Sequence, residues 1–227
     1  MSIFQTLDVP CPTCGAAVSF DLVHSVNADR RADLRQAILD RSFQRETCPS
    51  CGMVFRVEPE FTYINLKRQQ YIAVWPVSKR TQWKALEARS QASYDKAFGA
   101  GATPEARALA KDVAMRMVFG WPALNEKLIA AENGIDDRWL ELAKVGIVRN
   151  LDEVPVGDEM ELRLVAVADG ELKFGWIRAR SDELTDVIGV PRAVVDEIAA
   201  DPQPWAAVAE EVVGGAYVDY ARGLTAA

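Results

Sequence analysis

Two copies of one five-residue pattern contain every cysteine of the chain. The pattern Cys-Pro-x-Cys-Gly occurs at residues 11–15 and again at residues 48–52. Two residues between the thiolates allow one tight turn to direct both sulfurs at a single ion, while backbone NH groups of the turn offset their charge. Proline restricts φ where each turn begins, and glycine permits the positive φ with which the chain leaves it. The repeated pattern predicts one metal ion bound by Cys11, Cys14, Cys48 and Cys51.

Four thiolate ligands favour a single structural zinc ion as the cofactor. A tetrahedral site of this kind is closed, so no position remains for a water molecule that the metal could activate. The 33 residues between Cys14 and Cys48 exceed the gap of about 15 to 20 that is usual in zinc ribbons. A helix predicted between the motifs accounts for most of the excess. Iron can use the same four ligands and is an alternative.

Disulfide bonds and thiol-disulfide exchange are two further interpretations of the cysteines. We expect a cytoplasmic protein, because no apolar run of about 18 residues occurs and the first residues lack the basic and apolar regions of a signal peptide. Structural disulfides are disfavoured in that reducing compartment. Redox Cys-x-x-Cys motifs normally occur singly at the start of a helix, so the paired motifs favour a metal over exchange.

Hydrophobic patterning predicts an α+β fold in three parts, at residues 1–78, 79–150 and 151–227. The first part is a small zinc-ribbon-like β unit with an inserted helix, the second is a helical extension, and the third is an acidic α+β domain. Alternating or apolar runs predict the strands of the first part at residues 2–10, 16–23, 43–47, 53–57, 61–65 and 71–75, with a helix at 28–40.

Beyond the first part, helical periodicity alternates with glycine and proline. The pattern predicts helices at residues 79–97, 104–118, 122–132 and 136–148. In the third part, the dipeptide Asp169-Gly170 favours a tight turn between two strands. The remaining predictions are strands at 160–167 and 172–178, helices at 191–200 and 204–212, and a strand or short helix at 214–224.

The net charge of −7 comes almost entirely from the last third of the chain. Residues 1–80 hold ten Lys/Arg and eight Asp/Glu, residues 81–150 hold ten and nine, and residues 151–227 hold six and sixteen. Binding to phosphate backbones needs a concentrated basic surface, so general affinity for nucleic acids is not expected. The best candidate for contact with an acidic partner is a group of arginines on the inserted helix and the next strand, namely Arg30, Arg31, Arg35, Arg41 and Arg45. A helix face exposed to solvent is the commoner explanation for such a group.

The common catalytic arrangements are missing from the sequence. Residues 10–14 match the Pro-Cys-x-x-Cys half of the zinc deaminase signature, but the only histidine, His24, is not part of the required His-x-Glu pair. Once the cysteines are assigned to a metal, the usual pairs of nucleophile and base are nearly excluded. The glycines at 99 and 101 lack the lysine of a Walker loop. We therefore expect a protein that is not an enzyme.

Two other groups of residues have structural interpretations. Asp136 and Asp137 lie where acidic side chains stabilise a helix N-terminus, although the segment 134–138 could also form an interaction surface. Large aromatic side chains dominate core burial. We expect most of the six tryptophans to anchor contacts between the three parts of the chain.

The order of these features resembles that of the bacterial CpXC domain family, named for its paired Cys-Pro-x-Cys motifs. The similarity covers roughly residues 1–150 and fades in the acidic third. It is carried by the segments 26–29, 47–52, 63–75, 118–120, 126–129, 133–138 and 141–144. The resemblance implies a zinc-ribbon-like module with a helical extension. It supports the metal assignment but implies no established activity.

Three functions are compatible with a closed metal site. The favoured one is a module that binds or assembles with another protein, in which zinc holds a small β unit that could not otherwise bury enough core. The second is a nucleic-acid-associated zinc ribbon of the kind found in transcription machinery, which the acidic net charge disfavours. The third is a thiol redox protein or enzyme that uses the cysteines. No membrane partner is expected.

Overall fold

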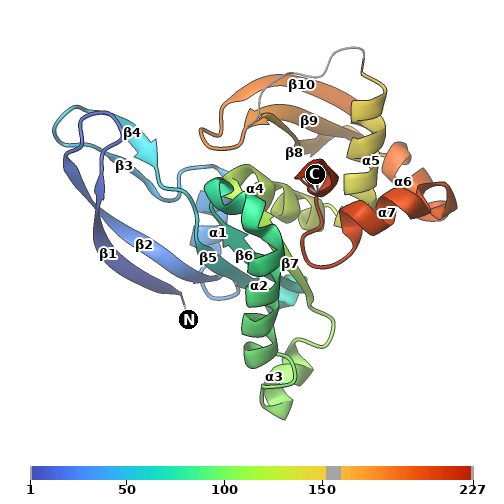
Figure 1. The fold of residues 1–227 in the computed structure, drawn as a ribbon, viewed down its shortest axis with the longest axis horizontal. Coiled ribbons are helices and arrows are strands. Elements are labelled where there is room, and N and C mark those ends of the chain that lie inside the picture. Colours follow the sequence, from blue (N-terminus) through green and yellow to red (C-terminus); the bar gives the residue numbers. More distant parts are fainter. Residues whose placement is uncertain (1, 152–159, 226–227) are drawn as a thin grey trace.

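The computed structural model describes residues 2–151 and 160–225, and it confirms the predicted α+β class (Figure 1). Its largest sheet has the strand order β1-β2-β5-β6-β7. The pairs β2–β5 and β6–β7 are parallel, and the other two pairs are antiparallel. The strands of this sheet are β1 (Ile3–Pro10), β2 (Ala17–Asn27), β5 (Phe61–Asn65), β6 (Gln70–Trp75) and β7 (Ala114–Phe119). A short 3-10 turn, η1 (Leu66–Arg68), joins the antiparallel strands β5 and β6 into a hairpin.

Strands β1 and β2 extend beyond the rest of the sheet as a two-stranded arm. β2 pairs with β1 along residues 17–25 but with β5 only along residues 25–27. A second hairpin, β3 (Arg45–Thr47) with β4 (Val54–Arg56), lies beside this arm (Figure 1). The side chain of Gln44 joins the two hairpins, because its amide nitrogen donates to the Asp21 carbonyl at 2.8 Å and its oxygen accepts from the Val23 NH at 3.2 Å.

Helices cover both faces of the five-stranded sheet. Helices α1 (Ala32–Leu39) and α4 (Gly120–Glu132) pack on one face, and α2 (Trp83–Ala97) packs on the other. Successive side chains of β6 alternate between the two cores, so that Ile72 faces α1 and α4 whereas Tyr71 faces α2. All residues of β6 are buried, as expected for a strand that is covered on both sides.

The predicted helix at residues 104–118 is wrong in its second half. Helix α3 (Pro104–Leu109) begins at the predicted proline, with the Thr103 hydroxyl accepting from the Ala106 NH, but the chain then forms β7 beside β6. Alternate side chains of β7 join the core against α2, namely Met115, Met117 and Phe119. Pairing with a buried strand and packing against α2 outweighed local helix propensity. The division at residues 78 and 150 stays a prediction, and the middle part contributes a strand to the sheet of the first.

The other helices of the middle part follow the sequence pattern. A 3-10 turn, η2 (Val77–Gln82), leads into α2, and α5 (Asp137–Arg149) follows α4. The turn between them uses Gly134, whose φ of +62° a residue with a side chain rarely adopts. Asp136 is the N-cap of α5, and its carboxylate accepts from the Arg138 NH at 2.9 Å. The capping interpretation of Asp136 is therefore confirmed.

The C-terminal part contains a three-stranded antiparallel sheet with the order β10-β9-β8. The predicted hairpin joins β8 (Met160–Ala168) to β9 (Glu171–Arg178), with positive φ at both Asp169 and Gly170. Strand β10 (Leu184–Pro191) was not predicted, because most of its residues are exposed at the sheet edge and show no apolar alternation.

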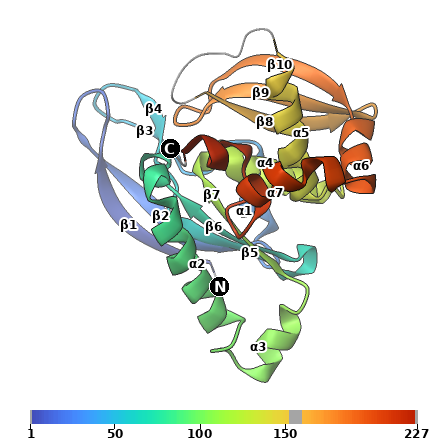
Figure 2. The same cartoon turned by 45° about the vertical axis from the view of Figure 1, so that its right-hand side comes forward.

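Helices pack against this three-stranded sheet, and Figure 2 shows the sheet and these helices side by side. Helix α3 lies far from this part of the molecule, beyond the end of α2. The two predicted helices are α6 (Ala193–Ala200) and α7 (Ala206–Val213), with a 3-10 turn, η3 (Gln203–Trp205), between them. The tail, for which a strand or a short helix was predicted, contains the 3-10 helix η4 (Tyr220–Thr225).

A network of buried ion pairs joins these parts of the molecule. Glu126 on α4 receives the Lys144 ammonium at 2.6 Å, the Arg163 guanidinium at 3.0 Å and the backbone NH of Leu164 at 2.6 Å. Five acidic and five basic side chains take part, so their formal charges cancel: Glu126, Asp137, Glu141, Glu161, Asp219, Arg80, Arg116, Lys127, Lys144 and Arg163. A buried charge without a partner is costly, and the network therefore holds α4, α5 and β8 in one relative arrangement.

Candidate metal centre

The two Cys-Pro-x-Cys-Gly turns form knuckles with the same backbone geometry. In the first knuckle the Cys11 NH donates to the Ala16 carbonyl at 2.8 Å and the Gly15 NH donates to the Cys11 carbonyl at 2.9 Å. The second knuckle repeats both hydrogen bonds at the same lengths. Gly15 and Gly52 both have φ of +73°, as the sequence pattern predicted. The first knuckle connects β1 to β2 and the second connects β3 to β4.

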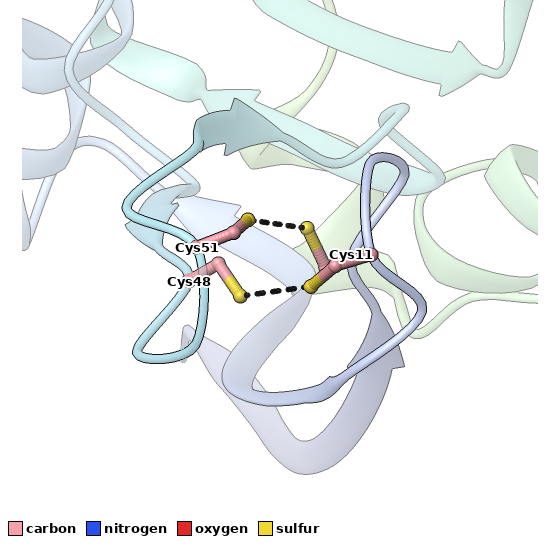
Figure 3. Close-up of side chains that lie close together, drawn as sticks. Cys11, Cys48 and Cys51 are labelled. Carbon is pink, nitrogen blue, oxygen red and sulfur yellow. Dashed lines mark hydrogen bonds between the residues drawn. The ribbon is translucent and has the colours of Figure 1, made fainter.

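The knuckles bring all four predicted ligands together (Figure 3). The sulfur of Cys11 lies 3.7 Å from that of Cys51, and the sulfur of Cys14 lies 3.6 Å from that of Cys48. All four sulfurs lie within 4.8 Å of one another. A tetrahedral ion with metal–sulfur bonds of about 2.3 Å needs sulfurs about 3.8 Å apart. The donor set and its spacing therefore fit one metal ion bound by four thiolates.

One cysteine of each knuckle is buried and the other is exposed. Cys11 and Cys48 are members of a small core with Val18, Phe20 and Phe55. The two phenylalanine rings lie 5.2 Å apart between their centres. This core is much smaller than the three others found among the described residues, so a further constraint is needed to hold the arm and the second hairpin together. A shared metal ion would supply that constraint.

Four thiols in so small a space do not ionise independently. Backbone NH groups, chiefly that of Cys14, point at the Cys11 sulfur and lower its pKa to about 7. For Cys51 the Met53 NH favours the thiolate, but the Cys14 thiol and burial oppose it, and its pKa is raised to about 12. A bound cation would remove this conflict, because thiolates are the form that ligates metals.

The predicted arginine cluster does not form a single free surface. Arg41 donates to the Asp182 carbonyl at 3.3 Å, and the Arg45 guanidinium lies 3.9 Å from the Asp182 carboxylate. Arg56 on β4, which was not in the predicted cluster, pairs with the same carboxylate at 2.6 Å. Arg35 pairs with Glu132 at 3.0 Å. The sequence contained no signal for the role of Asp182, which comes from a distant turn before β10 and anchors the second hairpin.

A tryptophan also anchors this hairpin to the body of the molecule. The indole NH of Trp121 on α4 donates to the Val57 carbonyl at 2.8 Å, and the Arg56 guanidinium lies 3.8 Å from the centre of the indole ring. His24 lies on the exposed surface, where its Nε2 is 3.0 Å from the side-chain oxygen of Gln5 on β1.

Residues 9–144 match the CpXC protein family, which is more than half of the chain. The match includes the end of β1, both knuckles, the other four strands of the large sheet and most of α5. Comparisons with curated proteins and with solved structures gave no match. Among the residues that the structure describes, no helix is long and apolar enough to cross a membrane. With its paired knuckles and the matched segment, the chain belongs to the CpXC family.

Proposed function

We propose that the protein is a cytoplasmic assembly module in which one structural zinc ion shapes an arm that binds another protein. The observation that carries this proposal is the four-cysteine cluster at the tip of a two-stranded arm whose outer strand, β1, is exposed and has one open edge. Zinc is favoured because four thiolates in a tetrahedral arrangement are its usual structural ligand set. Iron would use the same ligands. With all four positions filled by protein, the centre has a structural rather than a catalytic role.

The arm exposes apolar side chains beside an open strand edge. β1 is the outer strand of its sheet, so its outer NH and carbonyl groups can pair with a strand from a partner. Of the eight large apolar side chains exposed in the described residues, five lie on β1 or directly after the second knuckle: Ile3, Phe4, Leu7, Met53 and Val54. Exposed apolar side chains along an open strand edge can pack against those of a partner strand.

The alternatives have less support. A nucleic-acid module needs free cations near the metal, but Arg35, Arg41 and Arg56 are engaged with acidic or carbonyl partners. A redox Cys-x-x-Cys pair normally lies at the N-terminus of a helix, whereas both pairs here lie in turns between strands. Protein binding by the arm therefore remains our proposal.

The test uses the full, zinc-loaded chain as bait in extracts of its native host, with captured proteins measured by mass spectrometry. Leu7→Lys places a charge on the exposed side of β1, and Leu109→Lys makes the same change on α3, far from the arm. We expect specific partners to bind the wild-type and Leu109→Lys proteins and to be lost with Leu7→Lys. An identical set of partners for all three proteins would refute the role of the arm. Salt-sensitive binding to DNA or RNA would favour the nucleic-acid alternative instead.

A further inference from the structure

A polar cleft lies outside the metal centre, where β6 and β7 begin and α4 turns into α5. It has a volume of about 770 Å³, within the range of small-molecule sites. Among its lining residues, Gln70, Lys127 and Asp137 are largely buried, whereas Arg68 and Arg138 are about half exposed. No described residue of either knuckle lines it.

The strongest sign of a missing ligand is the side chain of Gln70. Only 8% of this residue is exposed, yet its oxygen Oε1 has no hydrogen-bond partner among the described residues. The orientation of the amide is determined by its nitrogen, which donates to the Lys127 carbonyl at 3.4 Å. Reversing the amide would place two carbonyl oxygens against each other. A buried acceptor is normally satisfied, and Oε1 has almost no accessible surface, so a molecule in the cleft would supply its donor once the Gln70 side chain turns toward it.

The neighbouring charged groups indicate which end of a ligand lies there. The Lys127 ammonium already donates to Glu141, to Asp137 and to the Val218 carbonyl, which uses its three hydrogens. The carboxylate of Asp137 receives Arg116 and Lys127 and retains capacity to accept another donor. The buried end of the cleft therefore presents acceptors, Gln70 and Asp137, to a group that carries N–H hydrogens.

The outer end of the cleft has the opposite character. Arg68 has an ion-pair contact at 3.8 Å with Glu132, which is too long for a hydrogen bond. Its side chain is 41% exposed and can meet an anion. Arg138 uses one edge of its guanidinium on Asp136 and is 49% exposed. Planar guanidinium groups are suited to carboxylates.

We propose that this cleft binds a small molecule with an ammonium group at one end and a carboxylate at the other, the chemistry of a free amino acid or a dipeptide. The ammonium donates to Gln70 and Asp137, and the carboxylate meets Arg68 and Arg138. The site is separate from the arm, so it does not depend on the assembly role proposed above.

Binding is tested by isothermal titration calorimetry on the full, zinc-loaded chain. The probes are the twenty common amino acids and a set of dipeptides at up to 10 mM, each compared with forms whose amine is acetylated or whose carboxylate is amidated. We expect saturable binding of at least one unblocked probe and a loss of at least tenfold in affinity when either end is blocked. The two sets of probes distinguish a free amino acid from a dipeptide. Absence of saturable binding by every probe would overturn the proposal.

Substitutions separate a binding role of Gln70 from a structural one. Gln70→Leu removes the unpartnered acceptor at similar size, together with the long bond to the Lys127 carbonyl, so the unfolding temperature should change little while affinity falls at least tenfold. Gln36→Leu, on the exposed side of α1, should change neither property. Arg68→Gln should weaken unblocked probes but not the amidated ones. Equal affinity of the wild-type and Gln70→Leu proteins would show that the ligand lies elsewhere.

Discussion

The ammonium of Lys144 on α5 lies 2.6 Å from a carboxylate oxygen of Glu126 on α4, and neither side chain has any exposed surface. Lys144 also lies 2.7 Å from Glu141, one turn earlier on its own helix. These three residues lie within the segment that matches the CpXC family. The contact ties α5, which packs against the three-stranded sheet, to α4, which packs against both sheets.

Loss of Lys144 should strongly destabilise the fold. Lys144→Met keeps the length of the side chain but leaves buried carboxylates short of a cation, which should cost about 3 kcal/mol in the free energy of unfolding. Urea denaturation followed by circular dichroism measures this difference. Arg31→Gln breaks an exposed ion pair with Asp33 and should leave the urea midpoint unchanged. Equal midpoints for wild type and Lys144→Met would show that the buried network contributes little.

Acid should destabilise the protein through Asp137. Burial alone would raise the pKa of this carboxylate, but Lys127 and Arg116 hold it well below its usual range. The folded pKa is thus lower than the unfolded value of about 3.9, so the contribution is complete above that value and is lost as the pH falls below it.

Asp137→Asn tests this pH dependence. The variant should be less stable than wild type at pH 7, and the difference should shrink between about pH 5 and pH 3. Urea denaturation at a series of pH values measures it. Asp201→Asn, at an exposed position after α6, should follow the wild-type curve. A constant difference between wild type and Asp137→Asn at all pH values would contradict the assignment.

Metal binding should require each of the four thiolates. The purified chain should contain one zinc ion, as measured by mass spectrometry under native conditions. Changes beyond the ligands typically cost about 10–100-fold in metal affinity, so loss of a ligand in Cys14→Ser should exceed 100-fold. Thr13→Ala alters the same turn without removing a ligand and should retain the ion. Full zinc content in Cys14→Ser would rule out the four-thiolate centre, and iron in the purified chain would replace zinc in the proposal.

The glycine after each second cysteine should matter for its backbone conformation alone. Gly52 has φ of +73°, and no described atom lies within 4 Å of the place that a β-carbon would occupy. Gly52→Ala should therefore cost about 1 kcal/mol in stability of the metal-loaded protein without any steric clash. Asparagine adopts this conformation more easily, so Gly52→Asn should cost less. Thermal unfolding of the three proteins in excess zinc measures the order, and an Asn variant weaker than the Ala variant would contradict it.

The two cysteine turns could be predicted from sequence because their geometry is local. Two residues between cysteines, a proline and a glycine determine each turn without help from the rest of the chain, and both knuckles formed as expected. The same holds for the Asp136 cap and for the Asp169-Gly170 turn. Each of these features depends on residues within a few positions of one another.

The sequence alone could not predict strand β7, the buried ion network or the Gln70 cleft. Residues 114–119 became a strand because they lie beside β6, and a charged residue such as Glu126 reads as a surface position until its partners are known.

The sequence by itself determined the two cysteine turns and the mixture of helices and strands, since local conformational preferences and the period of apolar residues decide these features. The tertiary structure alone decided which segments pair in the sheets, that Asp182 anchors the second hairpin, and that Gln70 faces a cleft with an unused acceptor. These contacts join residues far apart in the chain, and only the packing of the whole molecule brings them together.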